Sequence, residues 1–135
     1  MHTVEYTHRI QYRTLPKHGR SFPVLDVQLS HNEQSIDVIT VVDTGAEFTL
    51  ISGGYAMGIG LDLQSGRKGE LHTLGGSIVY WSHNVKVNIF DIFIEIEIRF
   101  SEQSIPRNLL GRDLLEYMRI GLREKHESLF CHTQG

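Results

Sequence analysis

Alternation of apolar and polar positions is the dominant pattern along this chain, and it predicts β-strands. Between residues 4 and 14, Val4, Tyr6, His8, Ile10 and Tyr12 would share one face, with charged or polar residues on the other. Residues 22–29 continue the alternation, and residues 92–100 carry it most clearly, with isoleucine at every second position up to 98. Residues 35–42 start in the same way and then become apolar on both faces, as a strand does when it enters a core.

Two interruptions of this pattern predict a hairpin and a helix. Gly75 and Gly76 lie between β-branched and aromatic residues in segment 70–87, which is typical of a β-hairpin with a mobile tip. Apolar residues recur at helical spacing over 109–118 and predict one short helix, whose first turn Asp113 would favour. A helix over 54–60 has weaker support because of its glycines. Many short strands and one late helix predict an all-β fold, either a small barrel or a sandwich.

Composition narrows the class of protein further. The 135 residues are 40% hydrophobic and show neither a linker nor a repeat, so we expect one domain over 1–135. The chain has 13 basic and 16 acidic residues, a net charge of −3. This charge argues against a protein whose main function is to bind the phosphates of nucleic acid. The single cysteine, Cys131, permits no internal disulfide and fits a cytoplasmic setting. The pattern shows no secretory signal and no apolar run of membrane-spanning length.

Asp43 is the first candidate for chemistry, because it follows directly on the apolar strand ending at Val42 and opens the tripeptide Asp43-Thr44-Gly45. A carboxylate that leaves an apolar strand is costly unless it is hydrogen-bonded or functional. Aspartate, threonine and glycine also make good turn residues. From the tripeptide alone, a structural turn and a catalytic loop therefore both remain open.

Three sequence blocks, taken together, resemble the retropepsins, the single-domain retroviral-type aspartic proteases. They are Val41-Val42-Asp43-Thr44-Gly45-Ala46, the hairpin segment Leu74-Gly75-Gly76-Ser77-Ile78, and Asn108-Leu109-Leu110-Gly111-Arg112-Asp113-Leu114-Leu115. The blocks follow the family's order and frame the chain from about Ser35 to about Arg123. The resemblance implies a closed all-β barrel with a flap hairpin and one short C-terminal helix, acting as a homodimer.

The resemblance also implies a catalytic site at Asp43, Thr44 and Gly45. Peptide hydrolysis without a metal or a nucleophilic side chain needs one carboxylate to accept a proton from water and another to assist the carbonyl oxygen. The chain holds one Asp-Thr-Gly, so the pair requires two copies of Asp43, one from each subunit of a homodimer. No cofactor is then needed.

Further roles follow from the same resemblance. Substrate, a polypeptide in extended conformation, would contact Ala46 and Glu47 and be covered by the flap residues Leu74, Gly75, Gly76 and Ser77. If the flanking motifs are set aside, the same segment is equally consistent with an exposed hairpin that has no mechanical role. Arg112 would be buried and form an ion pair with Glu47, and Asp113 would begin the helix instead of acting as a second acid. Tyr80 and Trp81, at the hairpin base, would pack structurally.

Other chemistry has little support in the sequence. The eight histidines include no closely spaced ligand pair, so no metal is expected. Gly53 and Gly58 have the spacing of a phosphate loop, but Ile59-Gly60 replaces its lysine and hydroxyl residue. Cys131, near the end of the sequence, has no identified basic activator and is interpreted as a bystander.

Two other functions remain open alongside the protease. One is a protease-like module that dimerises and binds extended peptides without turnover. The other is a monomeric β-barrel that binds a small ligand. The residues ahead of the family core and past Arg123 leave the dimer contact undefined, because the family's dimer-forming strands lie at the termini.

Overall fold

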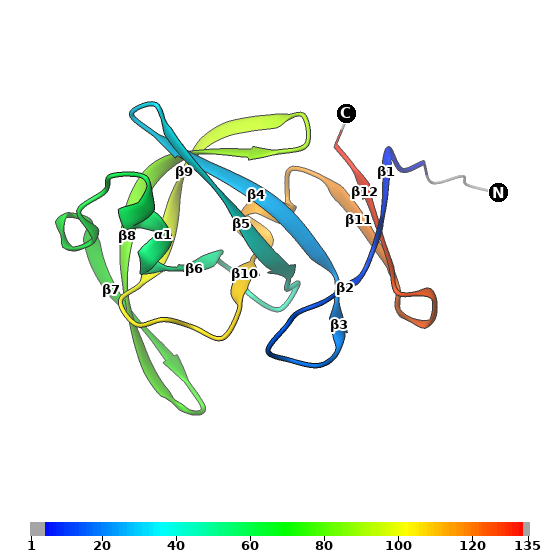
Figure 1. Cartoon of the computed structure of the whole chain (residues 1–135), viewed down its shortest axis with the longest axis horizontal. Coiled ribbons are helices and arrows are strands. Elements are labelled where there is room, and N and C mark those ends of the chain that lie inside the picture. Colours follow the sequence, from blue (N-terminus) through cyan, green and yellow to red (C-terminus); the bar gives the residue numbers. More distant parts are fainter. Residues whose placement is uncertain (1–4, 134–135) are drawn as a thin grey trace.

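The computed structural model describes residues 5–133, and most of its strands form one sheet that closes on itself (Figure 1). The strand order is β4-β5-β10-β6-β9-β8-β7, and an additional β4–β8 pairing joins Gln28 to Asn88 and closes a barrel. The members are β4 (Val24–His31), β5 (Gln34–Val42), β6 (Leu50–Ser52), β7 (Arg67–Thr73), β8 (Gly76–Ile89), β9 (Ile92–Ser101) and β10 (Asn108–Leu110). The all-β closed barrel expected from the sequence is confirmed.

Alternation predicted the strand faces correctly. In β9, Ile98 and Phe100 are fully buried while the charged residues between the isoleucines lie outside. The N-terminal alternation forms β1 (His8–Gln11) and β2 (Arg13–Thr14), with Tyr12 buried between them, and β2 pairs with β3 (Ser21–Phe22). Val4, assigned to the same face, lies outside the described residues.

The late helix is shorter than the pattern predicted. Helix α2 covers only Arg112–Leu115, whereas Leu109 and Leu110 belong to β10. These two leucines pair in parallel with Val41 and Val42, so a tertiary partner decides their conformation. The less supported helix does form, as α1 (Gly53–Gly58), and single 3-10 turns follow at Leu63–Ser65 (η1) and Glu124–His126 (η2).

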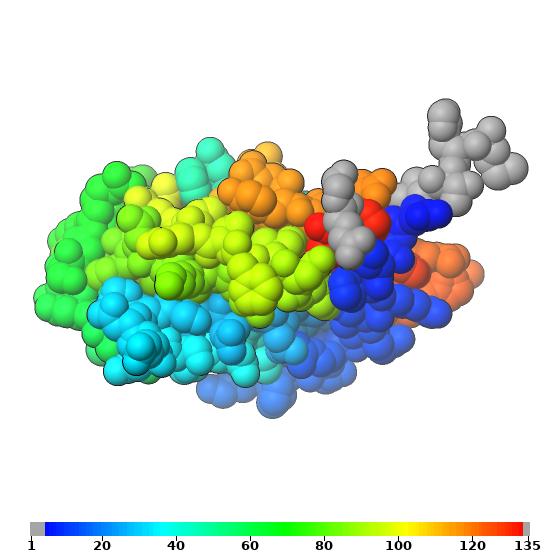
Figure 2. All heavy atoms as spheres, turned by 90° about the horizontal axis from the view of Figure 1, so that it is seen from above, coloured from blue at the N-terminus to red at the C-terminus, as the bar shows by residue number. Residues whose placement is uncertain are grey.

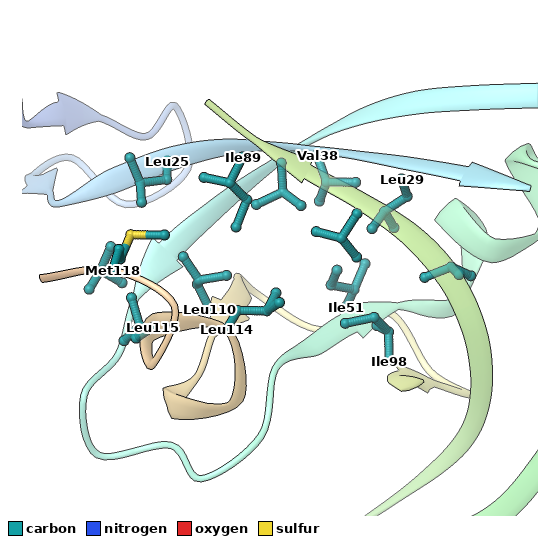
Figure 3. Packing of buried hydrophobic residues seen from close by; sticks show 14 of the residues in the cluster. Leu25, Leu29, Val38, Ile51, Ile89, Ile98, Leu110, Leu114, Leu115 and Met118 are labelled. Carbon is teal, nitrogen blue, oxygen red and sulfur yellow. The ribbon is translucent and has the colours of Figure 1, made fainter. Parts of the chain in front are cut away.

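The core fills the interior of the barrel (Figure 3). Its side chains come from the inward faces of the strands and from both helices, and α2 contributes Leu114 and Leu115. The labelled members of the cluster are Leu25, Leu29, Val38, Ile51, Ile89, Ile98, Leu110, Leu114, Leu115 and Met118. Packing of α2 onto this core fixes the residues just ahead of it, and these residues contact the candidate site.

The two ends of the described chain pair with each other. A separate sheet has the order β1-β12-β11, with β11 (Arg119–Arg123) and β12 (Ser128–His132), and His8 lies opposite Cys131. The spheres of this terminal sheet gather at one end of the molecule (Figure 2). Cys131 is fully buried in it, and burial raises the pKa of its thiol to about 11, so the thiol stays protonated and unreactive at neutral pH.

None of the helices within residues 5–133 is long and apolar enough to cross a membrane.

Candidate active site

Asp43 lies where β5 leaves the barrel, and the local backbone fixes its carboxylate. Its amide donates to the carbonyl of Leu110 at 3.0 Å, which anchors the residue to β10. The Gly45 amide donates to Asp43 Oδ1 at 3.0 Å, and the Ala46 amide to the Asp43 carbonyl at 3.2 Å. The Asp43 carboxylate is therefore oriented and half-buried, with Thr44 and Gly45 exposed beside it.

The rest of the loop rests on the segment that begins α2. The Arg112 amide donates to the Ala46 carbonyl at 2.8 Å, and the Asp113 amide to the Glu47 carbonyl at 3.2 Å. Gly111 packs against the loop backbone so closely that a Cβ there would lie 2.5 Å from the carbonyl carbon of Phe48. Two distant sequence blocks thus form one unit around Asp43.

A buried threonine and an aspartate connect the two segments of this unit by hydrogen bonds. Asp113 Oδ1 accepts from the Thr49 amide at 3.0 Å, from the Thr49 hydroxyl at 2.7 Å and from the Leu114 amide at 2.9 Å. The Thr49 hydroxyl in turn accepts from the Gly111 amide at 3.0 Å. Asp113 lies in the first turn of α2, as the sequence indicated, but it also holds the loop. Thr49 was missed, and its only signal is a hydroxyl in an otherwise apolar run.

The predicted ion pair between Glu47 and Arg112 is wrong for the single chain. Both side chains are exposed, and neither of them forms an ion pair with a described residue. Since α2 buries Leu114 and Leu115, it turns Arg112 toward solvent. The link between the two segments is made by backbone amides and by Asp113.

The predicted hairpin forms, and its tip is exposed in this structure. Leu74, Gly75, Gly76 and Ser77 are all exposed, and the β7–β8 hairpin projects away from the body of the molecule (Figure 1). Gly76 has a φ of +127°, which L side chains rarely adopt, and its carbonyl accepts from the Thr73 hydroxyl at 2.7 Å. The hairpin predicted from the sequence is therefore present, with its tip exposed to solvent.

A groove of about 750 Å³ runs along the outer face of β5. Val41 lines it, whereas residues 43–47 and the hairpin tip at 74–77 do not. Ile39 and Tyr55 add apolar surface, and Arg107 adds a cation. Ile39, Tyr55 and Arg107 carry no shared signal in the sequence, because they come from three separate segments. Within residues 5–133, no three histidine, cysteine or acidic side chains lie close enough together to hold a metal ion.

Comparison with known proteins identifies the class of protein. Residues 27–117, more than half of the chain, match the model of the family described as "gag-polyprotein putative aspartyl protease". The chain belongs to this retropepsin-like family, as its three sequence blocks indicated.

Solved structures show the same fold. A retropepsin-like aspartic protease from Rickettsia conorii is 19% identical, with a TM-score of 0.66 and 100% of both chains covered. EIAV protease in complex with the inhibitor HBY-793 is 22% identical, with a TM-score of 0.56, covering 77% of this chain and 92% of that one. No curated protein matches the sequence.

We expect Asp113→Ala to destabilise the fold by about 2–4 kcal/mol, because it leaves the buried Thr49 amide and hydroxyl without their acceptor. Asp113→Asn, which keeps an acceptor oxygen at that position, should cost less. Urea unfolding measures both, with the exposed Glu116→Ala in the same helical region as control. An Asp113→Ala variant as stable as Glu116→Ala would show that the network contributes little.

Proposed function

We propose that this protein is an aspartic endopeptidase that hydrolyses peptide bonds between two Asp43 carboxylates, one from each subunit of a homodimer. The observation that supports it most is the orientation of the single Asp43, fixed by the Gly45 amide and by backbone bonds to β10. One carboxylate accepts a proton from the attacking water while the other, protonated, assists the carbonyl oxygen of the substrate. A single chain supplies half of this pair.

The neighbouring residues have distinct roles in the proposal. Thr44 braces the two loops across the dimer, and Gly45 lets a peptide backbone approach because it has no Cβ. Ala46 and Glu47 line the path of the extended substrate beside Asp43. The exposed hairpin tip at residues 74–77 closes over an extended substrate.

In the proposed dimer, the two chains meet without exchanging their terminal strands. Since β1 and β12 already pair within one chain, the twofold contact uses surfaces that this pairing leaves free, including the outer edges of β1 and β11. The contact is isologous, so the same surface of each chain faces the axis on which the two Asp43 side chains meet.

The test of this proposal is cleavage of a diverse peptide mixture, followed by mass spectrometry, across a range of protein concentrations. Because only the dimer is active, cleavage per milligram should rise steeply with concentration and level off where sedimentation shows dimer. A dyad that shares one proton also gives activity that falls at both pH extremes, with a weakly acidic optimum.

Two outcomes would replace the proposal. A dimer that binds extended peptides but makes no cut at any pH would be a binding or assembly module. A species of single-chain mass at every concentration, with no cuts, would indicate a monomeric barrel for a small ligand.

A further inference from the structure

Arg99 is held between two aromatic rings, one from the catalytic loop and one from the flap hairpin. Its guanidinium carbon lies 3.6 Å from the ring centroid of Phe48 and 4.5 Å from that of Tyr80. Phe48 belongs to the loop that follows Asp43, and Tyr80 lies in β8, the second strand of the hairpin. Arg99 itself projects from β9 and is half-buried.

The stack continues across the sheet into the first strand of the hairpin. Gly69 of β7 lies directly opposite Tyr80, and a Cβ at Gly69 would collide with the tyrosine ring. Tyr80 and Arg99 are diagonal neighbours across β8 and β9, because Arg99 pairs with Ser82. A continuous row of contacts therefore runs from the flap base through Arg99 to the catalytic loop.

The rings are the contacts that hold this arginine. Within residues 5–133, the Arg99 guanidinium forms no hydrogen bond and no ion pair, unlike Arg67, which lies in the same cross-strand row and pairs with Glu97. A cation that lies between two rings and is partly desolvated attracts both of them. Gly111 and Asp113 hold the backbone of the catalytic loop, and the Phe48 ring connects this loop to the flap hairpin through Arg99.

We infer that Arg99 is a positioning residue that couples the flap base to the catalytic loop. This inference rests on the proposed protease function. When the hairpin moves over a substrate, the Tyr80 ring moves with β8, and Arg99 transmits that displacement to Phe48 and the backbone that carries Asp43. Loss of the cation uncouples the two segments without removing any group that touches the reacting atoms.

A double-mutant cycle tests the coupling. Phe48 and Tyr80 both contact Arg99, so Phe48→Leu and Tyr80→Leu should be non-additive in kcat, by about fivefold or more. In an Arg99→Met background the same two substitutions should become additive. Arg99→Met alone should lower kcat about tenfold with KM changed much less, and Arg99→Lys should restore part of it. Arg67→Met is the matched control and should leave kcat unchanged.

A second readout does not depend on activity. Hydrogen exchange should show that Tyr80→Leu speeds exchange of amides in loop 44–49, and that it has no such effect when Arg99 is methionine. Hydrogen exchange distinguishes a failure of the coupling from a failure of the protease proposal, because the measurement needs no turnover. The inference would be overturned if Phe48→Leu and Tyr80→Leu were additive in kcat with Arg99 present, or if Tyr80→Leu left hydrogen exchange in loop 44–49 unchanged. It would also be overturned if Arg99→Met lowered thermal stability but left kcat unchanged.

Discussion

Replacement of Asp43 by asparagine should reduce peptide cleavage by a factor of about 10³ or more, because both carboxylates of the dimeric site are lost together. An amide can neither accept the proton of the attacking water nor return one to the substrate. The side-chain oxygen of asparagine can still accept the 3.0 Å hydrogen bond from the Gly45 amide, so the loop should keep its conformation. The expected loss is thus one of chemistry and not of fold, and peptide mapping by mass spectrometry measures it.

Two controls separate this outcome from a general loss of structure. Asp37→Asn changes an exposed aspartate of the same strand, β5, and should leave cleavage intact. Excess Asp43→Asn protein mixed with wild type should also suppress wild-type activity, because mixed dimers hold only one carboxylate. Cuts that persist in Asp43→Asn would exclude an Asp43 dyad, and a mixture with undiminished activity would exclude a shared site.

Local pattern predicted the barrel strands because one face of each is buried and the other is not. It failed at Leu109 and Leu110, where adjacent leucines suit a helix and a strand equally well. Their conformation is decided by Val41 and Val42, far away in the sequence, which offer an open edge of β5. The pairing of β1 with β12 likewise joins opposite ends of the chain and carries no local signal.

In the candidate site, too, the sequence predicted the local motif but not the contacts between residues far apart in the chain. Asp43-Thr44-Gly45 is a local motif, and the structure gives it the oriented loop that the motif implies. The support beneath it joins Thr49 to Asp113 across 64 positions, so only the folded chain displays it. The arginine expected to supply that support, Arg112, is directed outward because the two leucines after Asp113 occupy the core.

Gly111→Ala should disable the site through the backbone alone. The added Cβ would lie 2.5 Å from the carbonyl carbon of Phe48 and 2.8 Å from the amide nitrogen of Thr49, and neither backbone atom can turn aside as a side chain can. The loop must shift, and this shift lengthens the hydrogen bond that the Gly111 amide donates to the Thr49 hydroxyl. We expect a loss of about 3 kcal/mol in unfolding free energy, typical of overpacking. Where protein remains folded, a displacement of about 1 Å at Asp43 should cost about 100-fold in kcat.

Gly54→Ala is the matched control for this substitution, because a Cβ at Gly54 meets no atom within 4 Å. Gly54 lies inside α1, where alanine is a better helix former than glycine, so this variant should gain about 0.5–1 kcal/mol and keep full activity. Urea unfolding and steady-state kinetics on both variants measure the contrast. If Gly111→Ala matched Gly54→Ala in both, the close contact between residue 111 and the loop would not be what holds Asp43 in place, and Asp113 would have to carry that role alone.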